Sequence, residues 1–273
     1  MPQCGGARDL FRIVSYLRFA MSVMGEPRWK LGRVSKAQSR LGLVTNWDVE
    51  CVQGEDLALA WHVFDDLLKD WNSPEGWRHR RSHVPKIDES REPLCVVIAV
   101  DATPFTWAVD VISALGVVEG ASQKGEFPVE KGIAEAESIA ATEGLATATS
   151  FSAPVVLLCG DNRGVGRGVW KGWSPKDDLD PWMLCCTSLL SLASKSYVGI
   201  DIPTDENYAD IATRERKVYS DDEIAFRLRR TYERAMTAAS IWRRTGQSYF
   251  GRESIVFDDE IDQEMEIYES DQE

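Results

Sequence analysis

Four acidic residues stand at places in the chain where a folded sheet could bring their carboxylates together. They are Asp101, Glu137, Asp161 and Asp210. The first and third end apolar runs, the second lies in an alanine-rich stretch, and the fourth follows a later strand-like segment. Burying an ionised carboxylate without a partner is costly, so each acid needs a counter-ion or a metal. Converging carboxylates are the ligands that hard divalent cations such as Mg²⁺ prefer.

The elements that position these acids can be predicted from hydrophobic patterns. Apolar, β-branched runs bounded by turn residues predict strands at 96–100, 106–115, 155–160 and 197–202, and a weaker one within 116–127. A short turn joins the first two, which predicts an antiparallel hairpin. Helical spacing predicts helices over 7–24, 55–71, 129–148, 181–193 and 222–244. Strands followed by alternating helices and strands predict an α/β fold with a mixed sheet.

Charge is distributed unevenly along the 273 residues, whose formal net charge is −13. Residues 258–273 contain nine acids and no base, whereas residues 1–50 contain eight bases and four acids. An acidic run of this kind is typical of a solvated, disordered tail. The most basic stretch includes Arg78, Arg80 and Arg81, which are candidates for contacts with a nucleic-acid backbone.

Composition also limits the cellular setting. No apolar run reaches the ~18 residues of a membrane span, so we expect no membrane association. The first residues lack the basic and apolar regions of a secretory signal. Six cysteines without CxxC pairs indicate a reducing compartment and no disulfide framework or zinc site. These features predict an intracellular protein of the cytoplasm or nucleus.

The four acids lie in short motifs with a recognisable order. The motifs are Ile-Ala-Val-Asp101-Ala-Thr, Ile133-Ala-Glu-Ala-Glu137, Cys-Gly-Asp161-Asn162-Arg-Gly-Val and Asn207-Tyr-Ala-Asp210-Ile-Ala-Thr-Arg214. Over roughly residues 94–215 the chain resembles the ribonuclease H domain of retroelement reverse transcriptases, of the tyrosine-recombinase type and the hepadnavirus-like type. Residues 8–71 are similar, more vaguely, to the thumb and connecting helices that precede such domains.

This resemblance implies a ribonuclease H-like, mixed five-stranded sheet flanked by helices and preceded by a helical region. The corresponding divisions are a helical thumb- or connection-like region at 1–92, a ribonuclease H-like domain at 93–217, a closing helix at 218–250 and an acidic, disordered tail at 251–273. It also implies that the chain is a C-terminal part of a reverse transcriptase and has the rest of that enzyme as a partner.

The implied activity is metal-dependent endonucleolytic cleavage of the RNA strand of RNA–DNA hybrids. The resemblance implies two Mg²⁺ ions, for which Mn²⁺ can substitute. Asp101 would bridge both ions, Glu137 and Asp161 would complete one site, and Asp210 would complete the other. Asn162 would contact a 2′-hydroxyl of the RNA strand.

Departures from the family pattern leave an alternative open. No histidine follows His83, whereas many members carry one in a loop before the last acid. Glu135 competes with Glu137 for the helical position, and we choose Glu137 because it shares a face with Ile133. The alternative function is that of a catalytically decayed or domesticated module for nucleic-acid binding or assembly. A transposase or integrase is disfavoured because its essential glutamate comes late, after two aspartates.

Overall fold

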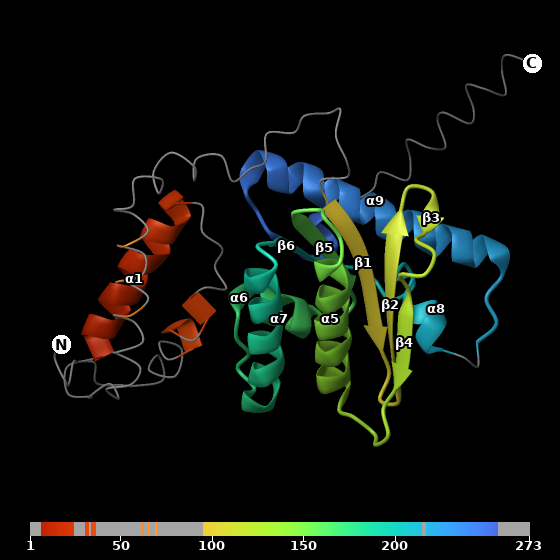
Figure 1. Cartoon of the computed structure of the whole chain (residues 1–273), viewed down its shortest axis with the longest axis horizontal. Helices are drawn as coiled ribbons and strands as arrows, with labels where there is room; N and C mark the ends of the chain where they lie inside the picture. Colours follow the sequence, from red (N-terminus) through yellow and green to blue (C-terminus); the bar gives the residue numbers. More distant parts are fainter. Residues whose placement is uncertain are drawn as a thin grey trace, which may run out of the picture.

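The computed structural model describes residues 7–24, 31–32, 34–36, 62, 65, 69, 95–214 and 217–255. Figure 1 shows their arrangement. Three described residues of the predicted helix 55–71, at positions 62, 65 and 69, are helical. Arg78, Arg80 and Arg81 lie outside the described residues, as does the acidic run 258–273.

The strands are β1 (Cys95–Ala102), β2 (Thr106–Ser113), β3 (Gly116–Val117), β4 (Gln123–Glu126), β5 (Val155–Gly160), β6 (Ser196–Asp201) and β7 (Tyr249–Phe250). The helices are α1 (Ala7–Met24), α5 (Ile133–Thr149), α6 (Arg163–Lys171), α7 (Asp180–Leu192), α8 (Asp210–Thr213) and α9 (Asp221–Thr245). Short 3₁₀ turns, η2 (Asp177–Leu179) and η3 (Arg252–Ser254), complete the described elements.

The seven strands of the described residues form one mixed sheet in the order β3-β2-β1-β5-β6-β7, with β4 also paired to β2. The pairing of β1 with β2 is antiparallel, as predicted for a hairpin, whereas β5, β6 and β7 add in parallel. The predicted mixed sheet flanked by helices is therefore confirmed.

The number of strands exceeds the expected five for two reasons. The predicted third strand is divided into β3 and β4, which both pair with β2. Between them the chain turns through Gly120, whose φ of +73° suits a residue without a Cβ. At the opposite edge β7 is an addition, and its Phe250 side chain is only 1% exposed.

Helices cover both faces of the sheet and enclose two apolar cores (Figure 1). One core joins α5, α6 and α7 to β1, β2 and β5 through residues such as Ile98 and Leu145. The other joins α9 to the opposite face through residues such as Leu157 and Ala238. With both faces covered, β1 and β5 are almost entirely buried, which explains their continuous apolar sequences.

Helix α6 was not predicted, because its sequence contains three glycines and glycine disfavours helices. Its ends compensate for this composition. The side-chain oxygen of Asn162 accepts hydrogen bonds from the backbone N–H groups of Gly164 and Val165, and the helix ends at Gly172, whose φ is +74°. Gly168 allows α6 to pack closely against α7, since a Cβ at this position would lie 2.5 Å from the sulfur of Met183.

The long helix α9 begins with a capping box, in which Ser220 and Glu223 exchange side-chain and backbone hydrogen bonds. Residues 251–255, expected to open a disordered tail, instead contain η3 and end at Ile255, which is buried beside α9. Burial of this apolar side chain keeps the segment against the sheet. Of the described helices, none is both long and apolar enough to cross a lipid bilayer.

Candidate metal centre

Three of the four acids converge at the carboxyl ends of the neighbouring parallel strands β1 and β5. Asp101 is the seventh residue of β1, and Asp161 directly follows β5. These strands are parallel neighbours in a constant register that pairs Ala99 with Cys159, so the two aspartates follow at matching positions. Glu137 approaches from the first turns of α5, which packs on β1. One ligand oxygen from each acid lies within 4.8 Å of the others.

The two glutamates that competed for the helical position have different surroundings. Glu137 is 5% exposed and faces Asp101 and Asp161. Glu135 points elsewhere, and its carboxylate pairs with the Lys131 ammonium at 2.9 Å. The helix thus presents one acid to the cluster and one to a basic partner.

Crowding of buried carboxylates makes this cluster electrostatically strained. Burial, and after it the charges of Asp101 and Asp161, raise the pKa of Glu137 to about 9. Burial is also the main reason why the pKa of Asp101 is raised to about 7; a hydrogen bond from the Thr213 hydroxyl opposes this shift, and the charges of Asp161 and Asp210 add to it. A bound divalent cation would favour the ionised forms. The oxygen-only ligand set suits Mg²⁺, Mn²⁺ or Ca²⁺.

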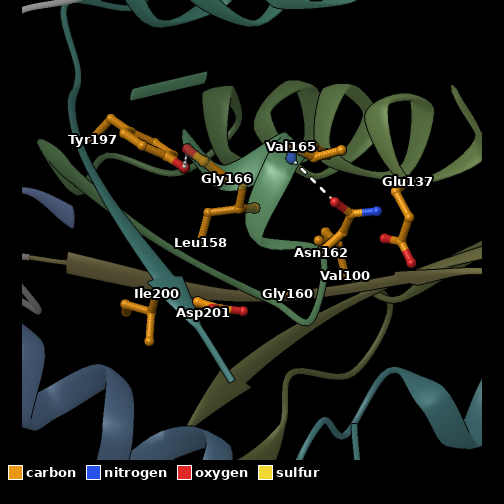
Figure 2. A pocket seen from close by; sticks show the side chains of 11 residues that line it. Val100, Glu137, Leu158, Gly160, Asn162, Val165, Gly166, Tyr197, Ile200 and Asp201 are labelled. Atoms are coloured by element: carbon orange, nitrogen blue, oxygen red, sulfur yellow. Dashed lines mark hydrogen bonds between the residues drawn. The ribbon is translucent and has the colours of Figure 1, made fainter. Parts of the chain in front are cut away.

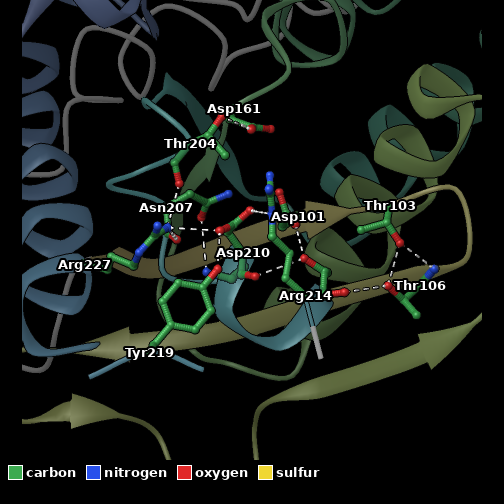
Figure 3. Close-up of polar contacts among 12 residues, drawn as sticks. Asp101, Thr103, Thr106, Asp161, Thr204, Asn207, Asp210, Arg214, Tyr219 and Arg227 are labelled. Atoms are coloured by element: carbon green, nitrogen blue, oxygen red, sulfur yellow. Dashed lines mark hydrogen bonds and ion pairs between the residues drawn. The ribbon is translucent and has the colours of Figure 1, made fainter. Parts of the chain in front are cut away.

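The fourth acid lies beside this cluster but is held differently. Asp210 opens α8 and is 1% exposed. Its carboxylate accepts hydrogen bonds from Arg214, from Arg227 at 3.2 Å and from the Tyr219 hydroxyl at 2.8 Å (Figure 3). It does not belong to the group of three whose ligand atoms meet. Two guanidinium groups therefore balance its charge in this structure.

Polar side chains from distant segments fix the backbone around the acids. The buried Asn207 amide donates to the Val100 carbonyl at 2.9 Å and so ties the last motif to β1 (Figure 3). The Thr204 hydroxyl donates to the Asp161 carboxylate at 2.6 Å. Asn207 lies in a motif that the sequence analysis recognised, but Thr204 was not identified. Arg227 and Tyr219 were not identified either, because both lie outside the four motifs, in α9 and in the loop before it.

A small pocket adjoins the cluster between α5, α6 and the sheet (Figure 2). Glu137 and Asn162 line it near the acids, and Tyr197 and Asp201 line its other side. Asn162 uses its side-chain oxygen to cap α6, which leaves its amide nitrogen on the side of Glu137 (Figure 2). The candidate RNA contact is thus also the residue that starts the helix after Asp161.

The fold and the cluster have the arrangement expected from the resemblance to ribonuclease H: a hairpin extended by parallel strands, with acids on β1, on α5 and after β5. No protein-family model matches the sequence, and no curated protein matches it.

Three solved structures of ribonuclease H proteins are similar to the chain. The N-terminal domain of Rv2228c from Mycobacterium tuberculosis is 20% identical, with a TM-score of 0.38, over 50% of this chain and 98% of that one. Ribonuclease H1 from Halobacterium salinarum is 20% identical, with a TM-score of 0.32, over 36% and 77% of the two chains. LC11-RNase H1 from compost is 15% identical, with a TM-score of 0.36, over 44% and 92%.

Proposed function

We propose that this chain is a metal-dependent endoribonuclease that cleaves the RNA strand of RNA–DNA hybrids. One observation carries the proposal: Asp101, Glu137 and Asp161 bring ligand oxygens within 4.8 Å of one another, with two of the three residues buried. Such crowding is costly for a purely structural cluster, because each charge opposes the others. A divalent cation compensates it, and the oxygen ligands are those of Mg²⁺.

Two Mg²⁺ ions would be held by Asp101, Glu137 and Asp161 together with Asp210, the acid nearest the second ion. When bound, a pair of ions polarises the scissile phosphate and lowers the pKa of an attacking water. The chain's own residues orient the acids: Thr213 donates to Asp101, and Thr204 donates to Asp161.

Recognition of RNA requires contacts to 2′-hydroxyl groups across a shallow minor groove. Asn162 fits this role because capping occupies its oxygen and leaves its amide nitrogen beside Glu137 (Figure 2). Arg78, Arg80 and Arg81 are proposed to contact the phosphate backbone. We also infer that the domain acts beside a reverse transcriptase, because its four acidic motifs resemble those of retroelement reverse transcriptases. Coding sequence without polymerase motifs around this reading frame would contradict that context.

Cleavage of a labelled RNA–DNA hybrid in Mg²⁺ tests the activity. We expect the wild type to cut the RNA strand and Asp161→Asn to lose roughly 100-fold or more in rate, because the variant removes a charged ligand. Glu135→Gln is the control, since this acid lies on the same helix as Glu137 but pairs with Lys131 instead of facing the cluster. Equal rates for the wild type and Asp161→Asn would refute the proposal. Duplex DNA and single-stranded RNA, offered in place of the hybrid, test whether cleavage is specific for the RNA–DNA hybrid.

A second candidate is hybrid binding without cleavage, as expected of a decayed or domesticated module. One observation favours it: Arg214 and Arg227 neutralise Asp210, the acid assigned to the second ion. Under this alternative the chain binds the hybrid and shows no Mg²⁺-dependent cleavage. Binding measured by fluorescence anisotropy, alongside the cleavage assay, separates the two.

A further inference from the structure

The segment Tyr249–Ile255, here called the C-terminal strap, returns to the sheet after α9. Its β7 pairs with β6 in a register that places Phe250 beside Ile200. Phe250 is 1% exposed and Ile255 is 3% exposed, so apolar side chains anchor the strap on both sides of η3. Burial of this kind fixes the position of the residues between the anchors.

Arg252 lies between the anchors and links two strand ends. Its Nη2 donates to the backbone carbonyl of Asp161 at 2.6 Å, directly after β5. Its Nε donates to a carboxylate oxygen of Asp201, the last residue of β6, at 3.3 Å. Gly160 of β5 and Asp201 of β6 are register partners. The guanidinium group therefore links the carboxyl ends of these two neighbouring strands, on the side of the sheet where the acid cluster lies.

A second arginine holds the strap from the core. Arg234 on α9 is 7% exposed and donates from Nη1 to the Ile255 carbonyl at 2.8 Å. Its other nitrogens pair with both carboxylate oxygens of Glu206, including an Nη2–Oε1 contact of 2.9 Å. A bidentate arginine–carboxylate pair has a well-defined geometry. Arg234 is therefore held in place by Glu206 while it donates to the strap.

Asp161 is therefore held at two points. Thr204 donates to its carboxylate, and Arg252 donates to its backbone carbonyl. Without the Arg252 contact, only the hydroxyl of Thr204, of these two, would hold the Asp161 carboxylate in its place beside Asp101 and Glu137. Removing a group that orients a metal ligand typically weakens metal binding about 10–100-fold.

We propose that Arg252 is a positioning residue of the metal centre, which holds the backbone of Asp161 so that its carboxylate meets those of Asp101 and Glu137. The inference rests on the proposed function, because it assumes that these acids bind a divalent cation. It adds the C-terminal strap to the elements that build the site.

The test is isothermal titration calorimetry of the full chain with Mn²⁺, which needs no substrate. We expect Arg252→Ala to weaken Mn²⁺ binding about tenfold, the lower range for residues that orient ligands. Arg252→Lys should give an intermediate loss, since one ammonium cannot reproduce the planar fork that reaches both acceptors. Arg229→Ala is the matched control: this arginine is 66% exposed on α9 and pairs with Glu233.

Thermal unfolding in a chelator accompanies each titration. Arg252 is 44% exposed in its side chain, so we expect Arg252→Ala to unfold within a few degrees of the wild type. In hybrid cleavage, the same variant should require about tenfold more Mn²⁺ for half-maximal rate at an unchanged KM for the hybrid.

Two outcomes overturn the inference, and they are distinguishable. If the wild type and Arg252→Ala bind Mn²⁺ equally, the positioning role is refuted while the proposed function stands. If the wild type itself binds no Mn²⁺, the proposed function fails and the inference fails with it.

Discussion

The metal-free protein should become more stable as the pH falls from 7 to 5, because of Glu137. The pKa of this carboxyl is raised from its ordinary 4.5 to about 9, first by burial and then by Asp101 and Asp161. Between these two values the folded chain holds a proton that the unfolded chain has released. The free energy of unfolding therefore falls as the pH rises through this window.

The magnitude follows from proton linkage. A difference of one bound proton changes the free energy of unfolding by about 1.4 kcal/mol per pH unit. Over the two units from pH 5 to pH 7, Glu137 alone should lower it by about 3 kcal/mol. Typical domains have only about 5–15 kcal/mol in total, so the effect is large enough to measure.

Urea unfolding at pH 5, 6 and 7, in the presence of a chelator, measures this slope. Glu137→Gln keeps the shape of the side chain but cannot ionise. The difference in pH slope between the wild type and the variant therefore isolates the contribution of Glu137 to the free energy of unfolding. Saturating Mg²⁺ should stabilise the wild type most at pH 7, because metal ligands must be deprotonated. Parallel pH profiles for the wild type and Glu137→Gln in the chelator would refute this reasoning.

Three further substitutions probe the surroundings of the cluster. Thr213→Val removes the hydroxyl that donates to Asp101 and should weaken Mn²⁺ binding about tenfold by calorimetry; an unchanged affinity would contradict that role. Arg214→Ala removes a positive charge beside Asp210 and should strengthen Mn²⁺ binding several-fold, the opposite sign. Asn207→Ala leaves a buried carbonyl unpaired and should cost about 1–3 kcal/mol in urea unfolding, whereas a loss below ~0.5 kcal/mol would show that water replaces the amide.

Much of the fold could be predicted because its signals are local. Asp101 and Asp161 each end an apolar run, and neighbouring parallel strands bring such ends to one edge of the sheet. The helix that carries Glu137 is marked by its alanine content, and Glu135 and Glu137 differ in the face on which they lie. Helix α6 could not be predicted in this way, because its stability comes from the Asn162 cap and from packing.

The contacts that finish the site have no local signal. Arg227 reaches Asp210 from α9, and Arg252 reaches Asp161 from a strap that the sequence analysis assigned to the tail. Arginines on a helix or near a chain end are usually solvated, so composition favours the wrong interpretation for both residues. Only the packing of α9 and β7 on the sheet brings their guanidinium groups to the acids.

The charge distribution around the four acids is unequal, and this has a consequence for the proposed pair of ions. Asp101 and Glu137 have raised pKa values because of burial and, after it, the charges of neighbouring carboxylates, whereas Arg214 and Arg227 already balance Asp210. A cation gains most where negative charge is least compensated. The first ion should therefore bind among the group of three acids. The second must compete with two guanidinium groups for Asp210, so the two ions should bind in separate steps of unequal affinity.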